Sequence, residues 1–132
     1  MDDTLYLVDK LADKKLDYLH ISLGDYKRAS VSEEYKEKSI MQYVHEKINV
    51  RLPLIGVDDV RTKEDAENTL AHAELVAVGR SLSIDPHWAS KLLEDKEDTI
   101  RRVLADQDRE ELMVGNDIID FLELMMPDRL LR

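Results

Sequence analysis

The sequence has no cysteine, few aromatic residues and fewer basic than acidic side chains. Because none of the 132 residues is cysteine, a disulfide scaffold, a thiolate metal site and a cysteine nucleophile are excluded. Aromatic residues make up only 5% of the chain, so leucine, isoleucine and valine must form most of the core. Against 29 acidic residues stand 19 basic ones, for a formal net charge of −10. This balance disfavours nucleic acid and an anionic membrane surface as partners.

Long apolar runs are also missing, and the first residues are acidic. The sequence therefore predicts neither a signal peptide nor a membrane-spanning helix, and we expect a cytoplasmic protein. What the chain does contain is 43% apolar and 36% charged residues. That composition and length suit one folded domain of ordinary size.

Apolar spacing divides the chain into alternating helices and short strands. Helical periodicity covers residues 4–15, 33–49, 62–72 and 87–94, and short apolar runs rich in strand formers cover residues 16–23, 52–57 and 74–78. Asp2 or Asp3 is expected to cap the first helix. Asp85 is expected to cap the last of these helices, with Pro86 at its first position. Residues 97–111 look helical, and an apolar stretch follows at residues 118–126.

Strands that alternate with helices predict an α/β fold with a parallel sheet. Three strands make a small sheet, whose two edges need cover. A complete (β/α)8 barrel needs roughly 250 residues, about twice the length of this chain. The pattern is therefore compatible with two hypotheses: a small three-layer α/β domain, or a part of a barrel.

Ligands of parallel α/β folds bind at the carboxyl ends of the strands. Backbone N–H groups at such ends can hold a phosphate, and an arginine adds a forked donor. An alternative to phosphate binding is that the two glycines are ordinary turn residues and the arginine is a surface residue. The two adjacent aspartates could bind a cation, act as a base or form a polar turn. The candidate residues follow the second and third strands and are Gly56, Val57, Asp58, Asp59, Gly79 and Arg80.

The sequence offers no catalytic or metal-binding set. The four histidines show no i, i+4 pair of the kind that binds a metal. His20 lies within a predicted strand, where a core position is expected. Ser22 has no histidine-bearing motif around it, so a hydrolase triad is unsupported.

Three segments carry a resemblance to a known family. Residues 16–26 resemble the sixth strand of old yellow enzyme-like NADH:flavin oxidoreductases. Residues 53–66 resemble their seventh strand and following helix, and residues 74–88 resemble their eighth strand and last barrel helix. The resemblance implies the C-terminal part, about strands 6–8, of a (β/α)8 TIM barrel. It places this partial barrel at residues 1–104 and a C-terminal helical tail at residues 105–132.

The resemblance also implies a cofactor and a reaction. Enzymes of this family contain FMN, take hydride from NADH or NADPH and pass it to an activated alkene or another acceptor. Amides after the seventh strand and the Gly-Arg after the eighth hold the FMN phosphate, and their counterparts here are Gly56, Val57, Asp58, Asp59, Gly79 and Arg80. The family usually has small residues in place of Asp58 and Asp59. Since carboxylates repel a phosphate, we expect FMN binding to be weak or absent in this chain.

The earlier strands of the family, which carry its catalytic residues, have no counterpart in this sequence. We therefore expect an FMN-dependent oxidoreductase fragment that does not transfer hydride alone. Its two sheet edges predict self-association or coverage by the tail at residues 118–131. Two alternatives are a cofactor-free interaction or scaffold module and a complementing half of a split barrel.

Overall fold

The computed structural model describes residues 1–57, 59–125 and 127–131, and the side chains of residues 129–131 are left out of the account. The chain divides into two compact units, the N-terminal unit Met1–Gly79 and the C-terminal unit Arg80–Arg132. The predicted boundary at residue 104, which concerns the extent of a barrel, stays a prediction.

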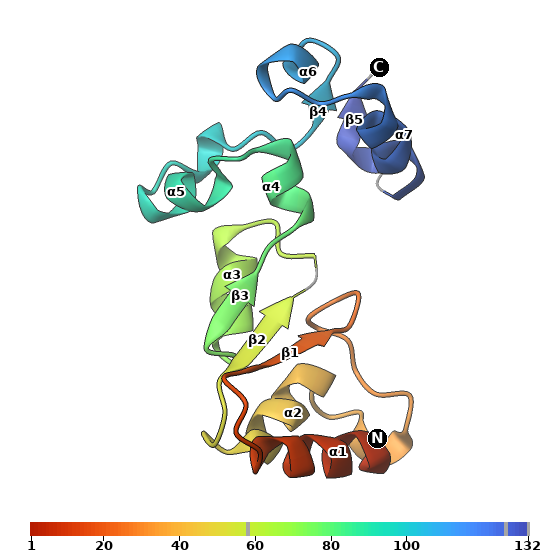
Figure 1. Cartoon of the computed structure of the whole chain (residues 1–132), viewed down its shortest axis with the longest axis vertical. Helices are drawn as coiled ribbons and strands as arrows, with labels where there is room; N and C mark the ends of the chain where they lie inside the picture. Colours follow the sequence, from red (N-terminus) through yellow and green to blue (C-terminus); the bar gives the residue numbers. More distant parts are fainter. Residues whose placement is uncertain (58, 126, 132) are drawn as a thin grey trace. The chain divides into compact units, whose positions relative to one another are not determined.

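The N-terminal unit is a three-stranded parallel sheet with helices (Figure 1). Strand β2 lies in the middle, with β1 and β3 on its two sides. Its elements in chain order are α1 (Asp2–Ala12), β1 (Leu19–Ser22), the 3-10 helix η1 (Glu33–Tyr35), α2 (Ile40–Ile48), β2 (Leu54–Val57), α3 (Lys63–Leu70) and β3 (Leu75–Ala77). The predicted α/β architecture of parallel strands that alternate with helices is confirmed.

Strand register decides which face of the sheet is buried. Leu19 pairs with Leu54, and Ile21 pairs with Gly56, so these side-chain positions share one face. Helices α1 and α2 cover that face. The resulting core consists of Val8, Ala12, Tyr26, Met41, Val44, Ile48, Leu52, Leu54 and Ala73.

The opposite face of the sheet carries the alternate residues. His20, Ile55 and Leu75 form one row across the three strands, and Ser22, Val57 and Ala77 form the next. His20 is exposed and Leu75 is 53% exposed. The expectation of a core position for His20 is therefore wrong, because strand alternation turns this side chain away from the helices.

Local hydrogen bonds explain where helices of the N-terminal unit begin. Thr62 caps α3 with a capping box, since its hydroxyl accepts from the Asp65 N–H at 3.0 Å and the Asp65 carboxylate accepts from the Thr62 N–H. The predicted single helix over residues 33–49 is wrong. Ser39 accepts from the Gln42 N–H at 3.2 Å and starts α2 anew. The predicted caps of α1 are also wrong, because Met1 is its N-cap and Asp2 and Asp3 lie in its first turn.

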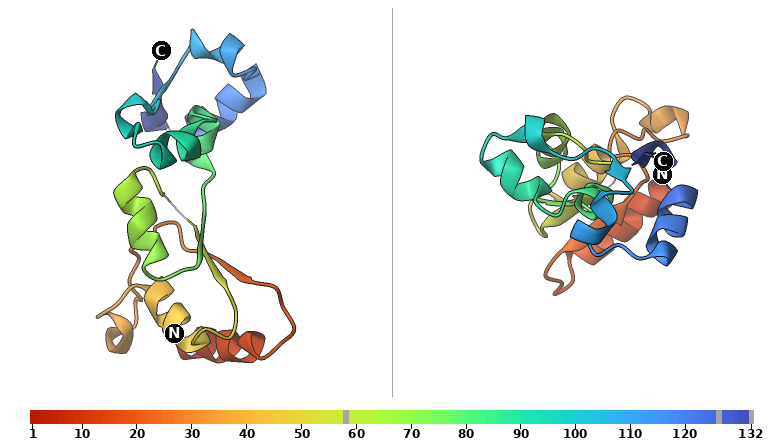
Figure 2. Two further views of the ribbon diagram at one scale, coloured as in Figure 1. Left: turned by 90° about the vertical axis from the view of Figure 1, so that its left-hand side faces the viewer. Right: turned by 90° about the horizontal axis from the view of Figure 1, so that it is seen from above.

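The C-terminal unit consists of short elements. They are α4 (Arg80–Ile84), α5 (Trp88–Leu93), η2 (Glu97–Thr99), β4 (Leu104–Ala105), α6 (Asp108–Glu111), α7 (Asn116–Met125), η3 (Pro127–Arg129) and β5 (Leu130–Leu131). Strands β4 and β5 pair in parallel. Figure 2 shows these short elements from two further directions.

Two sequence predictions for the C-terminal unit need correction. The helix expected over residues 97–111 is divided, because the Ala105 N–H binds the Asp108 carboxylate at 2.9 Å and Leu104 enters the pairing with β5. Helix α5 begins at Trp88 with His87 as its N-cap, so Asp85 is not its cap and Pro86 does not occupy its first position.

The apolar stretch at residues 118–126 is helical as α7 up to Met125, and residue 126 lies outside the described residues. Within the C-terminal unit, Leu122 of α7 is buried against Leu104. Coverage of a sheet edge by residues 118–131 stays a prediction. No helix in the described part of the chain is long and apolar enough to cross a membrane.

Candidate functional site

The candidate site lies where the strands of the N-terminal unit end. Ser22, Val57 and Ala77 are neighbours across the sheet, and each is the last residue of its strand. Since the strands are parallel, their carboxyl ends meet at one edge, where parallel sheets bind ligands. The structure thus brings the segments after β2 and β3 to the same end of the sheet.

Gly56 is required by packing against the helices. A Cβ atom at this position would lie 2.7 Å from Cγ2 of Thr69 and 2.9 Å from Sδ of Met41. Only glycine lets β2 approach α2 and α3 this closely. The absence of a side chain at Gly56 is therefore explained on the helix-covered face, independently of any ligand.

Asp59, which follows β2, forms an ion pair with Arg61. Asp58 lies outside the described residues. Asp59 has a positive φ of 47°, which is compatible with aspartate in a turn. Its carboxylate accepts from Nε of Arg61 at 2.7 Å. The Asp59 charge is therefore partly neutralised by Arg61.

Asp65 anchors the end of the same turn. Its carboxylate accepts from the N–H groups of Arg61 and Thr62, each at 3.0 Å, and from the Tyr26 hydroxyl at 2.9 Å. Burial raises the pKa of Asp65, but these hydrogen bonds outweigh burial and lower it below the usual value. An ionised Asp65 therefore joins the start of α3 to the loop after β1.

Gly79 and Arg80 follow β3. A Cβ atom at Gly79 would meet no described atom within 4 Å, so no described atom fills the space beside its Cα. Arg80 is exposed and is the first residue of α4. This short helix was not predicted from the sequence, since its five residues are too few to show apolar periodicity.

A histidine and a glutamate form a pair on the surface of the N-terminal unit. His45 lies 3.2 Å from the Glu74 carboxylate, and its ring centroid lies 6.5 Å from that of His72. Burial raises the pKa of Glu74, but hydrogen bonds from the Leu54 N–H and His45 lower it overall. Among the described residues, no group of three or more histidine and acidic side chains is arranged to hold a metal ion.

Comparison with known proteins identifies the relatives of this chain. It is 36% identical over 111 residues to a probable NADH-dependent flavin oxidoreductase of Bacillus subtilis, a match that covers 83% of this chain and 30% of that protein. It is 34% identical over 131 residues to the NADH:acrylate oxidoreductase of Vibrio harveyi, covering 96% of this chain and 13% of the relative. The NADH oxidase of Thermoanaerobacter brockii is 31% identical over 111 residues. No family model matches the chain.

The fold and the relatives together define the class of this chain. Its fold places it among α/β proteins with a parallel sheet, and the sheet has three strands. Its relatives then show that it is homologous to a segment of the NADH-dependent flavin oxidoreductases. It spans less than a third of the length of these relatives. The family resemblance seen in the sequence is confirmed.

Proposed function

We propose that this chain is the C-terminal barrel segment of an FMN-dependent NAD(P)H oxidoreductase and contributes the phosphate-binding part of the flavin site. The relatives support the flavin and NADH chemistry. One observation of the structure supports placing the phosphate site here. A short helix begins at Arg80, directly after the last strand of the three-stranded sheet and Gly79. In barrels, the loops after the last two strands and a short extra helix commonly form a phosphate site.

The chemistry of the described residues fits a phosphate. The open backbone at Gly79 allows a phosphate to approach closely, and the Arg80 guanidinium supplies a forked donor. The pairing of Asp59 with Arg61 reduces the repulsion that the turn after β2 would exert on an anion. On this proposal Gly56, Val57, Asp58 and Asp59 supply backbone from the β2 end, and Gly79 and Arg80 supply the β3 end. A bound flavin would provide the hydride chemistry of the full-length relatives.

We propose further that residues 1–104 correspond to about strands 6–8 of the barrel, residues 105–132 form its tail, and the chain alone is inactive. Strands β1 and β3 are the edges of the described sheet, and three parallel strands do not close a barrel. The flavin ring would therefore lack most of its surroundings. Purified chain supplied with FMN is expected not to oxidise NADH or NADPH above the flavin-only rate. Turnover above that rate would overturn the proposed inactivity.

The exposed edges also lead us to propose self-association. Unpaired backbone groups of β1 and β3 offer a second copy a place to add a strand. Multi-angle light scattering is expected to show a mass that rises above the monomer with concentration. A constant monomer mass would contradict this proposal.

A flavin titration tests the phosphate site directly. We expect the fluorescence of FMN to change saturably with added chain, while riboflavin, which lacks the phosphate, binds at least about tenfold more weakly. Arg80→Gln should abolish this preference. Arg102→Gln is the matched control, because Arg102 lies in the same unit and pairs with Glu97 at 2.9 Å. Equal binding of FMN and riboflavin by the unmodified chain, or no binding of either, would reject the proposed phosphate site.

Gly56 is a poor choice for the same test. Any side chain there collides with Thr69 and Met41, so a loss of binding in Gly56→Ala would report on packing as much as on phosphate. Arg80 is the cleaner position because its side chain is exposed.

A further inference from the structure

A buried carboxylate follows helix α4 in the C-terminal unit. Asp85 is 3% exposed and belongs to neither strand end of the candidate site. Its backbone N–H donates to the Ser81 carbonyl at 2.9 Å, and its own carbonyl accepts from the Trp88 N–H at 3.0 Å. The main chain of Asp85 thus links the last turn of α4 to the first turn of α5.

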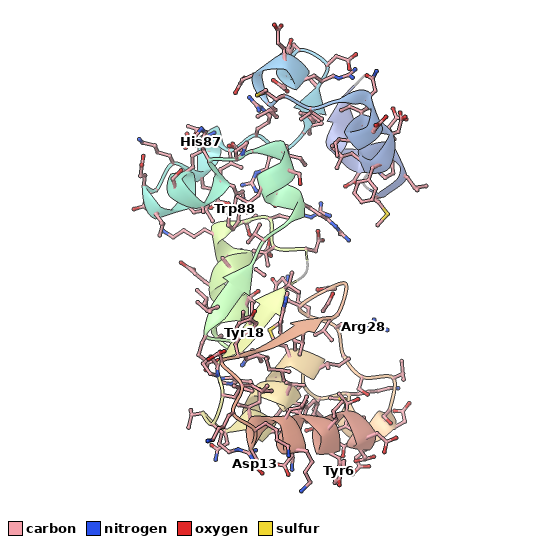
Figure 3. All side chains as sticks on the ribbon, viewed as in Figure 1. Tyr6, Asp13, Tyr18, Arg28, His87 and Trp88 are labelled. Carbon is pink, nitrogen blue, oxygen red and sulfur yellow. The ribbon has the colours of Figure 1, made fainter. Side chains whose placement is uncertain are left out.

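The side chain of Asp85 ties three further groups together. Oδ1 accepts from the His87 N–H at 3.0 Å. Oδ2 accepts from Nζ of Lys91 at 2.6 Å and from the Arg101 N–H at 2.8 Å. Figure 3 marks His87 and Trp88, the two residues at the start of α5 that this carboxylate and the Asp85 carbonyl engage. The carboxylate therefore connects the beginning of α5, the middle of α5 and the segment after η2.

These contacts keep Asp85 ionised. Burial raises the pKa of Asp85, but the hydrogen bonds from Lys91, Arg101 and His87 outweigh burial and lower it below the usual value. A buried charge is tolerated when its hydrogen-bonding capacity is met. Lys91 also donates to the Thr99 carbonyl at 2.9 Å, so the ammonium group is itself held in place.

Helix α4 depends on such an anchor. It has five residues, and isolated helices this short are unstable in water. Ser81 and Ile84 pack one side of it into the unit, and Asp85 fixes its end. Because Asp85 fixes the end of this five-residue helix, we expect a change at Asp85 to reach its first residue, Arg80.

We propose that Asp85 is a positioning residue: it clamps the end of α4 and so orients the Arg80 guanidinium for a phosphate group. This inference rests on the proposed function, because it needs Arg80 to bind the flavin phosphate. It goes beyond that function by assigning a specific role to a residue that touches no ligand.

The test compares FMN binding by Asp85→Asn, Lys91→Met and Arg80→Gln in the 132-residue chain. Asp85→Asn keeps an acceptor for the His87 N–H and places a donor against Lys91 and Arg101. We expect it to weaken FMN binding about tenfold. A loss of that size corresponds to one charge-assisted hydrogen bond, here the one proposed between the Arg80 guanidinium and the phosphate. Lys91→Met, which leaves two of the three side-chain contacts of Asp85 in place, should weaken FMN binding less.

Fluorescence of Trp88 separates positioning from folding. Trp88 is the single tryptophan of the chain and is 4% exposed, so its emission reports whether the C-terminal unit stays folded. The proposal expects weaker FMN binding with unchanged emission in at least Lys91→Met. Weaker binding only where the emission also shifts to the red would show a merely structural role and overturn the proposal.

Two further outcomes are distinguishable. If Arg80→Gln weakens FMN binding while both anchor variants bind FMN normally, the positioning role is wrong and the phosphate site stands. If the unmodified chain shows no preference for FMN over riboflavin, the proposed function fails and the positioning role fails with it.

Discussion

The two units of this chain are each stabilised by a different set of interactions. The N-terminal unit has a contiguous apolar core between α1, α2 and the sheet. The C-terminal unit also buries apolar side chains, such as Ile84 and Trp88, but its short elements are connected in addition by hydrogen bonds and ion pairs of the Asp85 carboxylate and of Arg101. Arg101 donates to the Glu111 carboxylate at 3.0 and 3.1 Å and lies 3.6 Å from Asp108.

This difference has a physical consequence. Apolar burial is non-directional and tolerates small shifts, whereas a buried polar network works only when each group meets its partner. We therefore infer that the polar network of the C-terminal unit adds directional control of particular groups to the stability that apolar burial gives both units. The phosphate-binding role proposed for Arg80, at the start of the C-terminal unit, is consistent with that inference.

The largest effect is expected from Leu54→Ala. Leu54 is 0% exposed and lies on the central strand, so the substitution removes contacts and leaves a cavity. We expect a loss of about 2–5 kcal/mol in the free energy of unfolding, seen as faster amide hydrogen exchange throughout residues 1–79. The exposed Leu93 is 87% accessible and provides the control variant, Leu93→Ala, which should change stability little. A loss as small for Leu54→Ala as for Leu93→Ala would contradict a core-dominated N-terminal unit.

Acid should affect the C-terminal unit more strongly. The pKa values of Asp65, Glu74 and Asp85 are all lowered from ordinary values of 3.8, 4.5 and 3.8 by hydrogen bonds that outweigh burial. A lowered pKa means that the charged form stabilises the fold above the ordinary value, and that this stability is lost as the pH falls through the folded-state pKa. Protonation therefore weakens both units below about pH 4.

The two units should differ in how they respond below that pH. Asp85 lies at the centre of its network, while Asp65 and Glu74 lie at the margin of an apolar core. Amide exchange compared at about pH 5 and pH 3 is expected to lose protection first around Ile84 and Arg101. Equal loss of protection in the two units would show that the apolar core gives no advantage in acid. Glu74→Gln provides a reference in which one titrating group of the N-terminal unit is absent.

The sequence predicts regular features better than the places where side chains redirect the backbone. The three strands and the capped helix after Thr62 follow from periodicity and from a local motif. The division of the predicted helix at residues 33–49 depends on Ser39, which also bridges to Ala29 ten residues earlier. The division at residues 97–111 depends on the local bond between Ala105 and Asp108 and on the pairing of Leu104 with Leu130, of which Leu130 is remote in the sequence. Helical periodicity carries no information about such distant partners.

The candidate site shows the same limit. The strand-end position of Gly56 could be read from the sequence, but the reason for a glycine there could not, because it depends on Thr69 and Met41 in two different helices. The cap predicted at Asp85 is wrong, because His87 is the N-cap of α5. Asp85 instead contacts the His87 N–H, Lys91 and, 16 residues away, Arg101, and only the fold brings these groups together.

The smallest effect among these tests concerns two helix caps of the N-terminal unit. Thr62 takes part in a reciprocal capping box, whereas Ser39 makes a single capping bond of 3.2 Å to the Gln42 N–H. We expect Thr62→Ala to cost about 1–2 kcal/mol and Ser39→Ala about 0.5–1 kcal/mol, as measured by urea unfolding. Since α3 follows the turn that holds Asp59 and Arg61, the Thr62 variant should also increase amide exchange at Arg61. If the two variants lose the same free energy of unfolding and amide exchange at Arg61 is unchanged, the reciprocal capping bonds do not order this turn beyond what the apolar core does. Polar contacts would then matter less for local order than we infer for the C-terminal unit.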